Sequence, residues 1–263
     1  ASALDVYQRY VTQFPEPVEI AVETRFKVAG MHKDAAAMEL YYAQLREIVD
    51  IDSSAGEERT PRIRYLAAQS ALVLAEDLFR QFDEVELMQP FEQSLLEKQK
   101  RMDDALAALE SLVDYEVGEV TAAATFYMAE IYSGFSRALM ESERPADLDP
   151  ASLQDYEMVL EEEAFPFEER AIEVHEKNLE LMAAGLFNPW IEKSLARLSE
   201  LMPGRYAKNE ISDGYVGSID SYAYRMPIVP DIDVAAPEDA KSPASDDAQL
   251  LPDAAAHVSP GGL

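Results

Sequence analysis

The sequence predicts an all-α protein built from antiparallel helices, and three observations support this prediction. Glycine is rare, with 10 residues among 263. Apolar residues recur three and four positions apart over long stretches, as they do on the buried face of a helix. Prolines stand where several of these stretches end, because a helix cannot use a residue without an amide hydrogen in its interior. Hydrophobic residues make up 48% of the chain and charged residues 28%, a composition typical of folded proteins.

Three helices are expected at the N-terminal end, in residues 3–17, 17–33 and 34–52. Prolines separate the first helix from the second. The third is expected to begin at Asp34, since aspartate is a favourable N-cap. The residues expected to face the core are Ile20, Phe26 and Ala29 in the second helix, and Leu40 or Tyr41, Leu45, Ile48 and Val49 in the third.

Three longer helices are expected in residues 54–82, 91–116 and 120–142. The first of them is rich in alanine, and small side chains allow a neighbouring helix to approach closely. The residues expected to pack inward are Ala67, Ala68, Ala71, Leu72, Ala75, Leu78 and Phe79 in the first helix, Leu95, Met102, Leu106, Leu109 and Val113 in the second, and Tyr127, Ile131, Phe135 and Leu139 in the third.

The stretch "LEEEAFPFEERAIEVHEKN", residues 160–178, is interpreted as a corner between two helices. Pro166 donates no backbone hydrogen bond and disfavours helix at the residue before it. Phe165 and Phe167 are expected to hold the corner in the core, and Glu161, Glu162 and Glu163 to lie on a solvated face. Before this stretch, Asp149-Pro150 signals a helix start. After it, residues 188–203 form the last helix, with Trp190 as a buried anchor and Pro203 as its end.

From about Tyr206 the character of the sequence changes. Residues 206–230 are rich in tyrosine, glycine and serine, and are expected to run extended over the helices. Residues 231–263 consist largely of proline, alanine and aspartate. We expect this tail to be disordered, because it carries too few large apolar side chains to offset the entropy of ordering it.

Composition narrows the possible partners. The formal net charge is -29, so the surface should repel nucleic acid and anionic membranes and attract basic protein partners. No cysteine is present, which excludes disulfides and thiolate sites. No window approaches the roughly 18 to 20 apolar residues of a membrane span. The chain starts with Ala1 and shows no signal peptide, so it is expected to be processed or a piece of a longer protein.

No catalytic, cofactor or metal motif is complete. His175-Glu176 would need a second histidine at position 179, which is Leu179, to match the zinc-protease pattern. A calcium loop starting at Asp50 fails at its sixth and twelfth positions. Phosphate-binding loops and the GxSxG elbow are missing too. We therefore expect no enzyme, cofactor or metal; the alternative is a helical hydrolase or lyase using a Glu/His pair such as Glu169 and His175.

The helices resemble tetratricopeptide (TPR) repeats, whose period is about 34 residues. With Pro15 as the proline that closes a repeat, Ala3 and Tyr7 fall at the small and aromatic positions of the motif, whereas Tyr10 departs from it. Ala29 in "RFKVAGMHKD" and Ala129 in "YMAEIYSGF" match the small position again. The resemblance implies a TPR-like solenoid of helical hairpins over residues 1–205.

Three blocks, residues 55–76, 142–178 and 188–206, resemble the C-terminal part of large TPR proteins of the bacterial envelope. In that family, such proteins accompany inner-membrane systems of the ExbB/ExbD and TolQ/TolR type, and others serve gliding motility. The resemblance covers roughly residues 1–210. It implies a periplasmic or envelope-associated scaffold in a Gram-negative bacterium, with the cytoplasm as the alternative compartment.

These observations predict a non-catalytic scaffold or adaptor for protein partners, such as a basic peptide or an envelope-complex subunit. Tyrosine and arginine supply much of the energy at protein interfaces, and a groove that carries them suits an extended peptide or a helix. The same tyrosines could instead fill the seams between helices. A second alternative is a regulatory module whose acidic tail mimics nucleic acid. The residues expected to line the groove are Tyr41, Tyr42, Arg62, Arg64, Tyr65, Tyr127 and Tyr132.

Overall fold

The computed structural model describes residues 3–207 of the chain, and every regular element among them is a helix. The all-α prediction is therefore confirmed for this part of the protein. The chain divides into residues 1–209 and 210–263, so the description below concerns the first unit only. The extended segment predicted for 206–230, apart from its first two residues, and the tail predicted for 231–263 lie outside the described residues.

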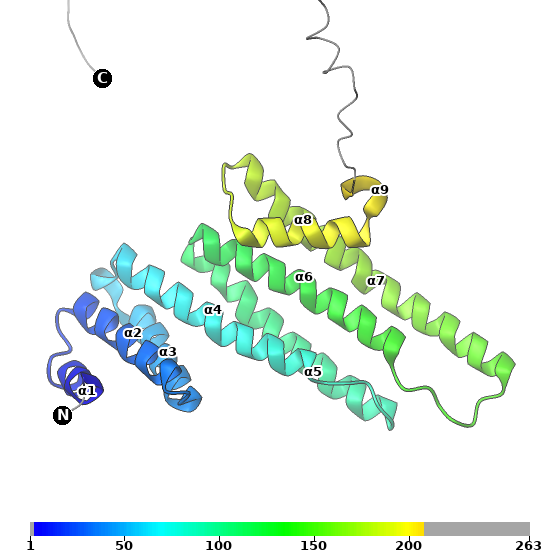
Figure 1. Ribbon diagram of the computed structural model, residues 1–263, viewed down its shortest axis with the longest axis horizontal. Coiled ribbons are helices and arrows are strands. Elements are labelled where there is room, and N and C mark those ends of the chain that lie inside the picture. The colour runs from blue at the N-terminus through cyan, green and yellow to red at the C-terminus, as the bar shows by residue number, and fades with distance from the viewer. Residues whose placement is uncertain (1–2, 208–263) are drawn as a thin grey trace, which may run out of the picture. The chain divides into compact units, whose positions relative to one another are not determined.

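Nine α-helices follow one another in the described residues, with 3-10 turns after the third and fifth (Figure 1). Their bounds are α1 Ala3–Gln13, α2 Val18–Asp34, α3 Met38–Ser54, α4 Pro61–Asp83, α5 Phe91–Glu110, α6 Gly118–Glu141, α7 Pro150–Ala183, α8 Pro189–Leu201 and α9 Pro203–Tyr206, with 3-10 turns at Gly56–Glu58 and Ser111–Tyr115.

Three of the helices begin with the same local chemistry. Thr60, Asp149 and Asn188 each accept hydrogen bonds from backbone N–H groups of the first turn, at 3.0 to 3.2 Å, and each is followed by a proline. The side chain satisfies a donor that has no partner within the helix, and the proline needs none. The start predicted at Asp149-Pro150 is thus confirmed, and Thr60 and Asn188 define the starts of α4 and α8.

At the N-terminal end, the structure corrects several expected positions. Asp34 is the last residue of α2 and not the N-cap of α3, since the chain turns through Ala36, at φ 56, before α3 begins. Ile20 and Phe26 are exposed, because α2 packs through its smaller side chains. Of the two alternatives at the start of α3, Tyr41 is in the core and Leu40 is not. The buried positions of α2 are Ala21, Val22, Thr24, Val28, Ala29 and His32.

The prediction of a corner at Pro166 is wrong. A single α-helix of 34 residues, α7, runs through it with the proline in its interior. Buried residues on both sides of Pro166, including Leu160 and Ala171, keep the two halves on one face against α6, so packing outweighs the lost backbone bond. Phe167 packs on Phe135 with ring centroids 4.5 Å apart, as expected, but Phe165 is 57% exposed.

The structure also corrects an expected core position at the end of α5. Val113 was expected to face inward and is exposed instead. The α-helix stops at Glu110, and the tighter 3-10 turn that follows places Leu112 in the core. Because a 3-10 turn has about 3.0 residues per turn, the apolar register of α5 does not continue through it.

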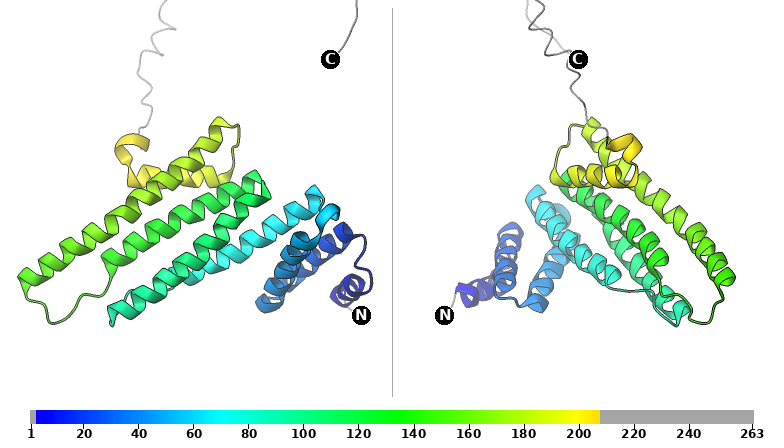
Figure 2. Two further views of the ribbon diagram at one scale, coloured as in Figure 1. Left: turned by 180° about the vertical axis from the view of Figure 1, so that it is seen from behind. Right: turned by 45° about the vertical axis from the view of Figure 1, so that its right-hand side comes forward.

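Each helix packs against the next in chain order, from α1 against α2 to α8 against α9. In addition, α4 contacts both α2 and α6, and α6 contacts α8 (Figures 1 and 2). Within residues 3–207, contacts among α3, α5 and α7 are at most marginal. The even-numbered helices α2, α4, α6 and α8 therefore form a continuous row, which we call the even-helix layer.

Two apolar clusters hold the helices together, and α4 contributes to both. Leu45, Ile48 and Ile63 lie in the first, between α2, α3 and α4. Phe82 and Phe135 lie in the second, between α4, α5, α6 and α7. Of the four alanines expected to allow close approach, Ala67, Ala68 and Ala75 have almost no exposed surface, and Ala71 is half-buried.

Candidate functional site

Two of the predicted tyrosines hydrogen-bond to two neighbouring carboxylates of α4, and a third lies beside one of them. The hydroxyl of Tyr42 donates to Oδ1 of Asp77 at 3.2 Å, and the hydroxyl of Tyr127 donates to Oε1 of Glu76 at 3.1 Å. Tyr41 lies beside Tyr42 with ring centroids 5.4 Å apart. Hydrogen bonds from tyrosines of α3 and α6 thus join both of these helices to α4.

Burial sets the chemistry of these hydroxyls. Tyr41 is buried, and Tyr42 and Tyr127 are half-buried. Burial, reinforced by nearby acidic groups, raises the pKa of Tyr41 and of Tyr42, and burial with Glu76 raises that of Tyr127. The hydroxyls therefore stay protonated and act as donors to α4. Only the outer edges of these rings are available to a partner.

The first turn of α4 carries the remaining predicted group. Tyr65 is 38% exposed, and the guanidinium of Arg62 lies 5.9 Å from its ring centroid while also pairing with Glu23 of α2 at 2.8 Å. At 3.6 residues per turn, Tyr65 shares one stripe of α4 with Glu76 and Arg80. This stripe faces outward from the even-helix layer between α3 and α6.

Two predicted residues lie apart from this stripe. Arg64 points to the other side of α4, where it pairs with Glu116 at 3.0 Å. Tyr132 lies near Arg170 of α7, whose guanidinium is 5.9 Å from the tyrosine ring centroid. The structure therefore brings together Tyr41, Tyr42 and Tyr127 around α4, aligns Tyr65 and Arg62 with them, and leaves these two residues elsewhere.

An aromatic cluster extends the same layer from α6 to α8. Trp190 is half-buried, and its ring lies 5.2 Å from that of Tyr127 and 5.6 Å from that of Phe126. Lys193 holds its ammonium 3.9 Å from the Trp190 ring centroid. The predicted anchoring role of Trp190 agrees with these contacts. Phe126 and Lys193 were not predicted as members of this cluster, because the contacts of Phe126 with Trp190 and Lys193 join two different helices.

A hollow of about 500 Å³ lies between the ends of α4 and α6. At its base, the buried Lys98 of α5 donates to the carbonyl oxygens of Phe82 at 3.1 Å and Val85 at 2.8 Å. Lys98 thereby satisfies carbonyls at the C-terminal end of α4. Burial lowers its pKa, although Asp83 opposes that shift. Charged side chains from the ends of these helices and from the segments that follow them line the hollow: Asp83, Glu86, Arg137, Glu141 and Glu143.

His175 lies in a separate, buried polar cluster that joins α6, α7 and α8. Its Nδ1 is 3.2 Å from the hydroxyl of Ser194. Its Nε2 is 3.3 Å from Oε1 of Glu130, an ion-pair distance whose angles fall short of a hydrogen bond. Arg197 donates to the same Oε1 at 2.7 Å. Asn178 donates to Ser194 at 2.8 Å and to the carbonyl of Ala122 at 3.0 Å.

The contact order serine, histidine, glutamate resembles that of a hydrolytic triad. A nucleophile, however, must reach its substrate, and neither Ser194 nor His175 has any exposed surface. The alternative pair of Glu169 and His175 is not brought together, since Glu169 is exposed and the neighbours of the imidazole are Glu130 and Ser194. The geometry is that of a buried hydrogen-bond network that holds α6, α7 and α8 together.

Comparisons with protein-family models, with curated proteins and with solved structures found no match to the chain. Within residues 3–207, no group of His, Asp and Glu side chains is placed to hold a metal ion. No helix in the same range has the length and apolarity needed to cross a membrane.

Because of Glu130, the contribution of this cluster to the stability of the fold depends on pH. Burial on its own would raise the pKa of Glu130, but the contacts with His175 and Arg197 outweigh burial, so the pKa lies below the usual 4.5. A carboxylate with a lowered pKa stabilises the fold above its unfolded-state pKa, and this contribution is lost as the pH falls through the folded-state value.

We expect Glu130→Gln to lower the free energy of unfolding by about 1.5–3 kcal/mol at pH 7, the contribution of hydrogen bonds to a charged group. The difference from the wild type should begin to shrink below pH 4.5 and should vanish once the pH is below the lowered pKa of folded Glu130, where the wild-type carboxylate is neutral too. Urea unfolding at a series of pH values measures it. Glu161→Gln, at an exposed site, is the control and should show no such trend; a constant difference for Glu130→Gln would contradict the expectation.

Proposed function

We propose that the protein is a non-catalytic, TPR-like scaffold that binds protein partners on its even-helix layer. The observation that carries this proposal is the contact pattern: α2, α4, α6 and α8 pack successively, whereas α3, α5 and α7 barely touch one another. Stacked helical hairpins with one continuous row of helices use that row as an extended binding surface. The lengths of α4 to α7 exceed those of TPR helices, so the likeness lies in the stacking.

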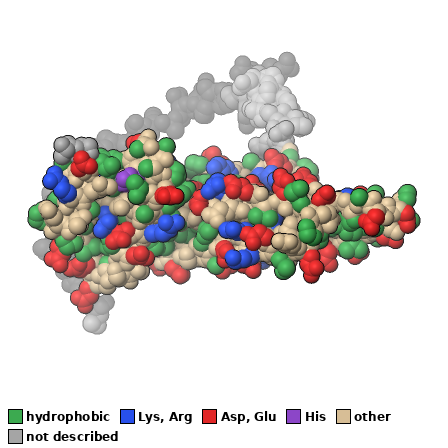
Figure 3. All heavy atoms as spheres, turned by 90° about the horizontal axis from the view of Figure 1, so that it is seen from below, with side chains coloured by type: hydrophobic (Ala, Val, Ile, Leu, Met, Phe, Trp, Pro, Cys, Tyr) green, Lys and Arg blue, Asp and Glu red, His purple; other side chains and the backbone are tan. Residues whose placement is uncertain are grey.

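The side chains on this layer support the proposal. Tyr65 and Arg80 are exposed along α4, and Lys193 and Trp190 are partly accessible on α8. Such residues contribute strongly to binding at protein interfaces. Acidic side chains are scattered over the surface, as one face of the molecule illustrates (Figure 3). With a net charge of -29, the protein should associate fastest with basic partners.

We extend the proposal to a complex of the bacterial cell envelope, with the chain in the periplasm. This extension rests on the resemblance of residues 55–76, 142–178 and 188–206 to envelope TPR proteins. A cytoplasmic scaffold is the alternative, and fractionation of cells that produce the parent protein distinguishes the two compartments.

Site-specific photo-cross-linking tests the binding surface. A photoreactive amino acid replaces Tyr65 or Arg80, which lie on one stripe of α4 about 22 Å apart, or Lys100 on the exposed side of α5 as the control. In cells producing the parent protein, both α4 positions should give adducts with the same partner, and the control should not. Equal yields of that adduct from all three positions, or adducts from the control alone, would refute the proposed surface.

A further inference from the structure

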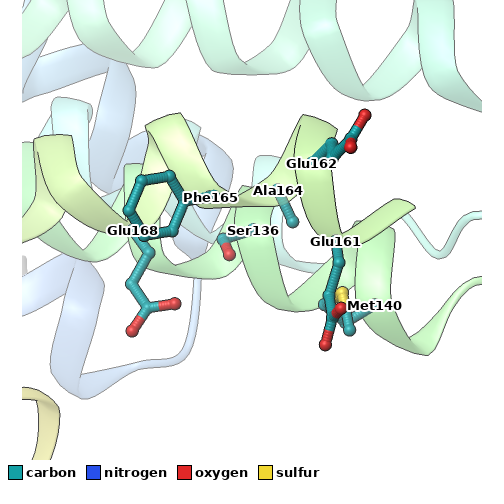
Figure 4. A pocket seen from close by; sticks show the side chains of 7 residues that line it. All are labelled: Ser136, Met140, Glu161, Glu162, Ala164, Phe165 and Glu168. Atoms are coloured by element: carbon teal, nitrogen blue, oxygen red, sulfur yellow. The ribbon is translucent and has the colours of Figure 1, made fainter. Parts of the chain in front are cut away.

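A second hollow, of about 540 Å³, lies on the α6–α7 pair. In Figure 4, Phe165 and Glu168 lie at one end and Glu161 and Met140 at the other, with Ser136 and Ala164 between them. The floor is thus formed by small side chains, and the two ends combine an apolar side chain with a carboxylate.

The apolar side chains of this hollow remain uncovered because α8 is short. It has 13 residues, whereas α7 has 34, and it packs on the half of α7 that holds His175. The other half of α7 extends beyond α8 (Figure 1). Phe165 is therefore 57% exposed and Met140 38% exposed, on a surface that continues the one covered by α8.

The carboxylates around the hollow also lack partners. Glu161, Glu162 and Glu168 are exposed and form no ion pair with any residue in the described part of the chain. Two glutamates further along α7 do form ion pairs: Glu173 with Arg170 and Glu176 with Arg205, each at 2.7 Å. Negative charge at the hollow is thus not neutralised within residues 3–207.

Pro166 affects an acceptor of a different kind, a backbone carbonyl. In a regular helix, the N–H of residue 166 would donate to the carbonyl of Glu162, one turn earlier. Proline has no such hydrogen, so this carbonyl has no donor from the helix ladder. Glu162 lines the hollow. The site therefore combines an exposed aromatic ring, unpaired carboxylates and a backbone carbonyl that lacks its usual donor in the helix.

We propose that this hollow binds a cationic amphipathic helix of a protein partner, in which two lysine or arginine residues flank an aliphatic side chain. Glu161 and Glu168 are two helical turns apart, about 10 Å, which matches basic residues two turns apart on a partner helix. The aliphatic side chain would contact Phe165 and Met140. A second copy of this chain does not fit, because it carries the same charge of -29.

The hollow includes Ser136 and Met140 of α6, but none of the residues on α4 and α8 that carry the proposed function, so the inference does not rest on that function. A partner helix would be a protein ligand recognised by charge complementarity together with one apolar contact. Anionic lipid surfaces would be repelled by the same carboxylates. If the hollow does not bind the peptide, the adducts expected from Tyr65 and Arg80 are unaffected. If those adducts do not form, the hollow can still bind the peptide.

The probe is a labelled, alanine-based helical peptide with two lysines seven residues apart and a leucine midway, titrated by fluorescence anisotropy. Phe165→Ala should weaken binding at least about tenfold, as truncation of an aromatic anchor does. The charge reversal Glu161→Lys/Glu168→Lys should weaken it at least as much. Asp103→Lys/Glu110→Lys on α5 is the matched control, with the same spacing and charge change at exposed positions, and should cost less than about threefold.

Two further measurements test the Glu162 carbonyl and the contribution of charge to binding. Pro166→Ala restores a helical donor for the Glu162 carbonyl and should weaken binding about two- to fivefold, the loss of one hydrogen bond. Raising the ionic strength from about 0.01 M to about 0.15 M should weaken binding. The inference is overturned if the wild type shows no saturable binding, if Phe165→Ala binds like the wild type, or if both charge-reversed variants lose affinity equally.

Discussion

Phe82→Ala is expected to lower the free energy of unfolding by about 3–5 kcal/mol, the range for deleting a fully buried aromatic side chain. The Phe82 ring has no exposed surface and belongs to the larger apolar cluster. Its Cε1 lies 3.3 Å from where a Cβ on Gly134 would stand, so α6 approaches the ring closely. The Lys98 ammonium lies 4.3 Å from its centroid. A cavity here would disturb α4, α5 and α6 together.

Phe165→Ala is the matched control, since it deletes the same atoms at an exposed position. Its effect on stability should stay within about 0.5 kcal/mol. Urea unfolding followed by circular dichroism measures both variants. Similar losses in the two would show that Phe165 is buried in solution, and would contradict both this expectation and the exposed hollow on α7.

Phe82 also shows what the periodicity of the sequence cannot predict. The spacing in residues 54–82 identified a helix and its alanine-rich face, and Ala67, Ala68 and Ala75 are buried as expected. Phe79 was selected as a core residue, yet Phe82, one turn later, is the more deeply buried of the two. Both lie on adjoining stripes of α4. Which stripe is deeper depends on where α5 and α6 pack, and local spacing does not contain that information.

Helix starts were predictable where the chain carries a cap followed by proline, as at Asp149-Pro150. They were not predictable where competing signals coincide. Asp34 has the side chain of an N-cap but the backbone position of a last helical residue. Ile20 is apolar and exposed because α2 packs through smaller side chains. In each case tertiary packing decided between two locally acceptable arrangements.

For the candidate site, the sequence indicated residue types but not their partners. Tyrosines were selected, yet the carboxylates that fix Tyr42 and Tyr127 lie on α4, 35 and 51 residues away in the chain. The same holds for His175, whose neighbours come from α6 and α8. Motif spacing can identify a site on one helix. It cannot identify one assembled from three, which is why Arg64 and Tyr132 were grouped with residues that they do not approach.

Pro166→Ala is expected to raise the free energy of unfolding by about 2–3 kcal/mol, since proline is about 3 kcal/mol less favourable than alanine inside a helix. Pro166 lies at an exposed position in the middle of α7, so alanine leaves no cavity. The new N–H can donate to the carbonyl of Glu162. Thermal and urea unfolding measure the change.

Pro150→Ala is the control, on the same helix but at its first position, where a backbone N–H has no partner within the helix. There proline is already compatible with the fold, and its removal only frees the unfolded chain. This variant should therefore lose about 0.4–1 kcal/mol. The same substitution would then raise the free energy of unfolding at one position of α7 and lower it at the other. Destabilisation by Pro166→Ala would instead mean that α7 bends at Pro166 in solution and that the fold depends on the bend.

The sign of the stability change in Pro166→Ala also helps to explain why α7 contains a residue that is unfavourable in a helix. A proline that costs stability beside Phe165 and unpaired glutamates would be explained by the proposed binding site, since functional sites often trade stability for activity. A variant that is more stable and binds the cationic helix less well would separate these two quantities in one substitution. If stability rises and peptide affinity stays unchanged, the Glu162 carbonyl contributes nothing to recognition, and the hollow would act through Phe165 and its carboxylates alone.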